Sequence, residues 1–167
     1  MSNNKDQKHK AKVENKTKRE AFIFQVQYAR KQNTPTISED APELLAEMET
    51  ICDKGLHDAL LALKDIVYGV RKDLGAEPES DRCSLNGAIV PYVLGITTFQ
   101  PTDADTYVPG VFTAEPPLQV TIAYDNEVRG KVMDWVKAKG YNTTTRLAQP
   151  IIKLPNMVVE VKRIVKN

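Results

Sequence analysis

The sequence lacks most features that stabilise secreted proteins or anchor membrane proteins. It has two cysteines, Cys52 and Cys83, which are too few for a disulfide framework and do not form a zinc-type pair. It has no apolar run of membrane-spanning length, and its first residues are polar rather than those of a signal peptide. These absences predict a cytoplasmic protein in a reducing compartment, with no membrane partner.

A large excess of one charge is also absent. The 23 basic and 22 acidic residues give a formal net charge of +1, which indicates no class of partner. The charge is uneven, however, because residues 1–20 carry seven cations against three anions, a local excess of +4. The cations considered as nucleic-acid contacts are Lys8, Lys10, Lys12, Lys16, Lys18 and Arg19. The pattern is typical either of a solvated flexible tail or of a basic arm that binds phosphates by charge.

The first third of the chain predicts a tail followed by a folded domain. Residues 1–20 contain too few apolar side chains to offset the entropy of ordering, and Pro35 marks a break. We therefore predict a flexible basic tail and linker over residues 1–36 and a domain over residues 37–167. The element at 21–30 stays open, since its apolar residues fit either a strand or a helix.

The sequence of residues 37–167 predicts helices that alternate with a few strands. Asp40 as N-cap, Pro42 and Gly55 bound one helix, and Gly75 ends a second that starts near Asp58. Further helices are expected at 85–95, at 126–139 with Asp125 as its cap, and at 156–165, where valines leave a strand possible. Residues 141–152 are expected to be extended. The pattern predicts an α/β or α+β domain, a small mixed sheet packed with about five helices.

Residues 118–124 form the clearest strand. Leu118, Val120, Ile122 and Tyr124 alternate with Gln119, Thr121 and Ala123, the period of a strand with one packed face. Phosphoryl-transfer enzymes often place aspartates at the alternate positions of such a strand. Here an amide, a hydroxyl and a methyl group occupy them.

Residues 41 to about 165 resemble the palm region of the α subunit of bacterial DNA polymerase III, the C-family replicative polymerase. The densest match is the run from Arg82 to Thr97, Arg-Cys-Ser-Leu-Asn-Gly-Ala-Ile-Val-Pro-Tyr-Val-Leu-Gly-Ile-Thr. The helix ending in Gly140-Tyr141 and the later Ala148-Gln149 and Ile151-Ile152 pairs are similar to further family blocks in the same order. The resemblance implies a nucleotidyltransferase-like palm fold.

The resemblance also implies that the catalytic site is lost. The family's catalytic aspartates fall on Gln119, Thr121 and Ala123, which cannot hold two magnesium ions. In the phosphate-binding turn Arg82 and Ser84 match, but Cys83 replaces a glycine. Asp103 and Asp105 have the spacing of a metal-binding carboxylate pair, but they lie in a loop rich in Pro and Thr, where no strand fixes their geometry. We therefore expect no enzymatic activity, no metal and no cofactor.

Two functional hypotheses follow. The first is an inactive palm-like protein, of phage or mobile-element type, that binds DNA or a replication component. In it, Arg82, Ser84 and the basic N-terminal residues attract phosphates. The second is a structural or interaction protein, such as an assembly subunit or inhibitor, that reuses the fold as a protein-binding surface. The sequence specifies neither the partner nor the oligomeric state.

Overall fold

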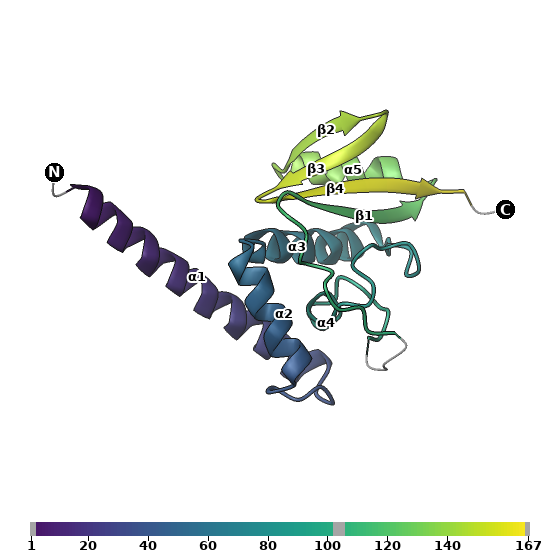
Figure 1. Ribbon diagram of the computed structural model, residues 1–167. Coiled ribbons are helices and arrows are strands. Elements are labelled where there is room, and N and C mark those ends of the chain that lie inside the picture. The colour runs from purple at the N-terminus through teal and green to yellow at the C-terminus, as the bar shows by residue number, and fades with distance from the viewer. Residues whose placement is uncertain (1–2, 102–105, 166–167) are drawn as a thin grey trace.

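The computed structural model describes residues 3–101 and 106–165. Within these residues five helices accompany one four-stranded sheet, which confirms the predicted α/β class (Figure 1). The elements are, in order, α1 (Asn3–Asn33), α2 (Pro42–Asp53), α3 (His57–Leu74), α4 (Ile89–Val93), β1 (Leu118–Asp125), α5 (Arg129–Ala138), β2 (Asn142–Arg146), β3 (Gln149–Leu154) and β4 (Met157–Ile164).

Helix α1 contradicts the predicted flexible tail and linker over residues 1–36. The chain is helical from Asn3 to Asn33, so the open element at 21–30 is also helical. Phe22 and Val26, one helical turn apart, are fully buried in the common core. The second half of α1 therefore belongs to the folded body, while its first half projects away from it (Figure 1).

Helices α2 and α3 confirm the predicted pair. Pro42 occupies the first turn of α2, and Gly75 ends α3 in the left-handed conformation with φ of 63°. The predicted cap at Asp40 is wrong, because Ala41 holds the N-cap position and no side chain caps the helix. Asp40 instead accepts a hydrogen bond from the Ser38 hydroxyl.

The sheet is mixed, with strand order β1-β4-β3-β2. Strand β1 runs parallel to β4, and the remaining pairs are antiparallel. The helix predicted at 156–165 is wrong, because this segment forms strand β4. Its valines at alternate positions, Val159 and Val161, are buried and pack beside β1. Helices α3 and α5 share one core with Val120, Ile122 and Tyr124, so they cover the same face of the sheet.

Two further details differ from the predicted boundaries. Helix α5 begins at Arg129, and Val128 rather than Asp125 is its N-cap, without a side-chain capping bond. The Asp125 carboxylate instead accepts a hydrogen bond from the Glu127 backbone N–H at 3.0 Å. The segment predicted to be extended at 141–152 is extended in β2 and β3, but Leu147 and Ala148 at positive φ form an unpredicted turn that makes it a hairpin.

A buried carboxylate joins α2 to α4. The Glu47 side chain is 9% exposed and accepts hydrogen bonds from the backbone N–H groups of Ile89 at 3.0 Å and Val90 at 2.6 Å. The first N–H groups of a helix have no partner within the helix itself. Glu47 thus caps the short helix α4 from a distant position in the sequence.

Candidate nucleic-acid interface

The polar positions of β1 share one face of the sheet, as their alternation predicts, but they form no anionic site. Gln119 is exposed, Thr121 is half-buried and Ala123 is only 2% exposed. The Gln119 side-chain oxygen accepts a hydrogen bond from Arg146 at 2.9 Å, and Arg146 lies 3.9 Å from the Glu160 carboxylate. These positions therefore carry a hydrogen-bonded, charge-balanced surface.

The predicted phosphate-binding turn lies along the edge of β1 that faces away from β4. The Ser84 N–H donates to the Thr121 carbonyl at 3.0 Å, and the Ser84 hydroxyl oxygen accepts from the Thr121 N–H at 2.9 Å. The Glu79 N–H adds a bond to the Ala123 carbonyl at 2.8 Å. Ser84 therefore closes a sheet edge, which is a structural role, whereas Arg82 is exposed to solvent.

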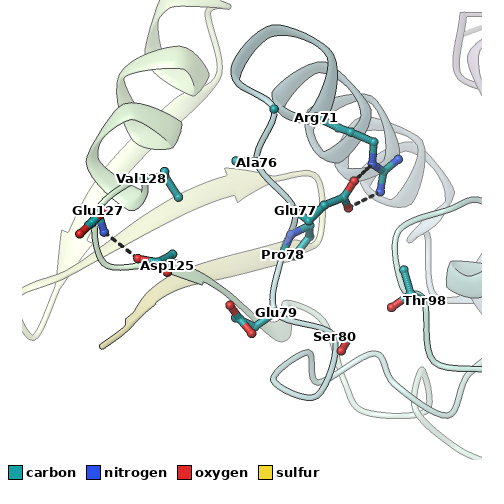
Figure 2. Close-up of a pocket in the computed structure, with 11 residues that line it drawn as sticks. Arg71, Ala76, Glu77, Pro78, Glu79, Ser80, Thr98, Asp125, Glu127 and Val128 are labelled. Carbon is teal, nitrogen blue, oxygen red and sulfur yellow. Dashed lines mark hydrogen bonds and ion pairs between the residues drawn. The ribbon is translucent and has the colours of Figure 1, made fainter. Parts of the chain in front are cut away.

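A pocket of about 840 Å³ opens at the C-terminal end of β1 (Figure 2). Arg71 makes a two-pronged ion pair with Glu77 on its wall, and Glu79, Asp125 and Glu127 also line it. The pocket wall therefore carries four carboxylates and one guanidinium, and this excess of negative charge disfavours the binding of a polyanionic nucleotide. None of the five positions predicted from β1 and the turn lines this pocket: Arg82, Ser84, Gln119, Thr121 and Ala123.

Among the described residues there is neither a group of metal ligands nor a membrane-spanning helix. Over residues 3–101 and 106–165, no three His, Cys, Asp or Glu side chains are grouped so that they could bind a metal ion. The carboxylate pair considered at Asp103 and Asp105 lies outside the described residues. No helix within the same ranges has the length and apolar character needed to cross a membrane.

The two cysteines are free, as predicted. Burial is the main cause that raises the pKa of the Cys52 thiol and of the Cys83 thiol above the ordinary value. Since the thiolate is the reactive form, neither side chain is arranged as a nucleophile.

Tyr124 provides a test of how the packed face of β1 is built. Its side chain is fully buried, and its hydroxyl has no hydrogen-bond partner among the described residues. Burial is also the main cause that raises the pKa of Tyr124. We expect Tyr124→Phe to raise the free energy of unfolding by about 1 kcal/mol, because it removes an unpaired buried hydroxyl and keeps the ring. Urea unfolding measures the change, and a loss of stability would show that the hydroxyl has a partner.

Helix α1 arranges its cations in a way that the flexible-tail interpretation could not reveal. Five of the cations recur at intervals of three or four residues, the spacing of a single helical face. At 1.5 Å per residue this face is about 21 Å long. We call it the basic face of α1, and it consists of Lys5, Lys8, Lys12, Lys16 and Arg19.

The opposite side of α1 carries a stripe that is balanced in charge. Asp6, Lys10, Glu14 and Lys18 follow one another every four residues, so acids and bases alternate along the helix. Such pairs each stabilise a helix by about 0.2–0.5 kcal/mol. Lys10 and Lys18, both predicted as nucleic-acid contacts, therefore lie outside the basic face, and each stands four residues from an acid of the same helix.

The basic face has the opposite character. Lys8 stands four residues from Lys12, which stands four residues from Lys16, and like charges at this spacing destabilise a helix. The sequence places no acid three or four residues from Lys5, Lys8 or Lys12. All four lysines of the face are exposed. A polyanion bound along this face would relieve the repulsion.

The basic face is attached to the body at its C-terminal end. Arg19 binds the Asp53 carboxylate at 3.1 Å, and the neighbouring Lys18 lies 3.5 Å from that of Asp58. Lys16 and Arg19 also line a pocket of about 480 Å³ beside the joint between α2 and α3. These contacts orient the helix, so that Lys5, Lys8 and Lys12 project beyond the body.

The structure divides the predicted nucleic-acid contacts between the basic face of α1 and its charge-balanced stripe. Sequence reasoning named Lys8, Lys12, Lys16 and Arg19 but missed Lys5, which the helical spacing adds. That spacing was present in the sequence and could have been found by testing residues 1–20 for helical periodicity. No protein-family model and no curated protein sequence matches this chain.

Proposed function

We propose that this protein is a non-catalytic, palm-like DNA-binding protein of the cytoplasm, and that the basic face of α1 contacts the DNA phosphates. The observation that carries this proposal is the row of exposed lysines at helical spacing, Lys5, Lys8, Lys12 and Lys16, on a helix that leaves the body. Lysine side chains bind phosphates by charge and give little sequence preference.

The proposed loss of catalysis is supported by the β1 surface. A two-metal reaction requires carboxylates that bridge both ions, and β1 offers Gln119, Thr121 and Ala123 where the polymerase resemblance places them. Arg146 and Glu160 flank Gln119 and share its polar contacts. The family resemblance, and a phage or mobile-element origin, remain part of the proposal.

The width of a DNA groove supports an α-helix as the contacting element. The major groove of B-DNA is about 12 Å wide and admits one helix. A row of four lysines over about 17 Å can follow the phosphates that border it. Arg82, exposed elsewhere on the surface, is a secondary phosphate contact in this proposal.

Fluorescence anisotropy with a labelled duplex across a salt series tests the proposal. Four phosphate contacts predict that log K falls with log salt with a slope of about −3.5, or about a hundredfold between 50 and 200 mM salt. No binding at low salt would refute the proposal. A stable protein partner that survives nuclease treatment would favour the alternative of a protein-binding role.

A further inference from the structure

A groove between α1 and α3 carries three solvent-exposed aromatic rings. Phe24 and Tyr28 project from α1 and Tyr68 from α3, and these residues are 70%, 60% and 59% exposed. They line a pocket of about 560 Å³. Large rings gathered in one exposed place contribute little to the fold and mark a binding surface.

The remaining groups in the groove are amides and cations. Gln25, Gln32 and Asn33 supply side-chain amides, and Lys64 and Arg71 supply positive charge. Arg71 already binds Glu77, so the charge of the groove rests mainly on Lys64. No carboxylate belongs to the described residues that line it. The groove is therefore complementary to a ligand that is both aromatic and anionic.

We propose that this groove binds unpaired bases of a single-stranded nucleic acid. The rings of Phe24 and Tyr28 lie nearly parallel, with centroids 6.4 Å apart and planes inclined by 20°. Bases stack on such rings with little dependence on sequence, while amide groups can bond base edges and a lysine can bind the phosphate. A helical peptide would require a mainly aliphatic floor, and here only Ala29 and Leu94 offer one.

This site is separate from the basic face of α1. At 100° per residue, the groove residues of α1 point about 150° away from the basic face, on the far side of the helix. The inference also has its own basis, exposed aromatic rings rather than a row of lysines. Single-strand binding in the groove can hold even if duplex binding by the basic face fails.

Single-ring substitutions with a labelled twelve-nucleotide oligothymidylate test the proposal. Phe24→Ala, Tyr28→Ala and Tyr68→Ala are each expected to weaken its binding at least about fivefold. Tyr28→Phe and Tyr68→Phe keep the ring and should bind as the unaltered protein does. Phe99→Ala is the matched control, because Phe99 is 40% exposed and is not among the groove residues, so its affinity should be unchanged.

High salt distinguishes this site from the basic face. At about 0.5 M salt the phosphate contacts are screened, whereas the ratio of affinities between the unaltered protein and Phe24→Ala should persist. Unchanged thermal melting of the variants confirms that they fold. Equal affinity of all three alanine variants and the unaltered protein would overturn the proposal. Self-association that disappears on removal of the rings, measured by sedimentation, would also overturn it, because a second copy would then occupy the groove.

Discussion

Replacing Glu47 with alanine is expected to lower the free energy of unfolding by about 2–4 kcal/mol. The reason is that the backbone N–H groups of Ile89 and Val90 both donate to this carboxylate in the interior. Alanine leaves both donors buried without an acceptor and opens a space between α2 and α4. Urea unfolding followed by circular dichroism measures the loss.

Two further variants separate the causes of that loss. Glu47→Gln keeps one acceptor oxygen and is expected to cost less than half as much as Glu47→Ala. Glu49→Ala is the matched control, since Glu49 is exposed on the same helix and should change stability by less than about 0.5 kcal/mol. Equal stability of Glu47→Ala and Glu49→Ala would contradict the role given to Glu47.

The same carboxylate predicts a dependence on pH. Burial raises the pKa of Glu47 above its ordinary value of 4.5, and the two backbone N–H donors offset this in part. Between the ordinary and the raised pKa the folded chain binds more protons than the unfolded chain, so the contribution of Glu47 to stability falls as pH rises. We therefore expect the stability of the unaltered protein, relative to Glu47→Gln, to decrease as pH rises above 4.5.

Charge reversal on the basic face has the second large expected effect. We expect the double substitution Lys8→Glu and Lys12→Glu to weaken duplex binding by about tenfold to a hundredfold at 0.1 M salt. It should also reduce the salt slope by at least about 2, because two phosphate contacts are lost. Anisotropy titrations at several salt concentrations measure both quantities.

Loss of the helix cannot account for such a result. The acidic side chain placed at position 12 stands four residues before Lys16, a favourable pair, so the variant helix should be at least as stable. Lys131→Glu with Lys137→Glu is the matched control, with the same charge change on exposed positions of α5. If this control weakens binding as much as the α1 variant, net charge rather than the basic face governs binding.

Much of the domain was predictable because its local signals agree with its packing. The helix with Pro42 in its first turn, the stop at Gly75 and the two-residue period of β1 all appear in the structure as predicted. Turn and capping residues act within a few positions, so the sequence carries their effect directly. Predictions failed where two local structures were equally acceptable, as for the valines of β4.

The candidate site was less predictable, because some of its features depend on local strand geometry and others on contacts between residues distant in sequence. The sequence correctly placed Gln119, Thr121 and Ala123 on one face, since a strand alternates its side chains. It could not show that Ser84 bonds the edge of β1, since the two are distant in sequence. It also missed the basic face, because a tail treated as flexible has no faces.

The sequence alone determined the α/β class and the absence of carboxylates from Gln119, Thr121 and Ala123 of β1, because residue identity and period suffice for both. The tertiary structure alone decided that residues 3–33 form a helix. Residues 3–20 have too few apolar side chains to fold by themselves, but Phe22 and Val26 bury against the body and fix the helix from its second half. Anchoring by distant contacts, rather than local propensity, thus aligns the lysines and opens the aromatic groove beside α3.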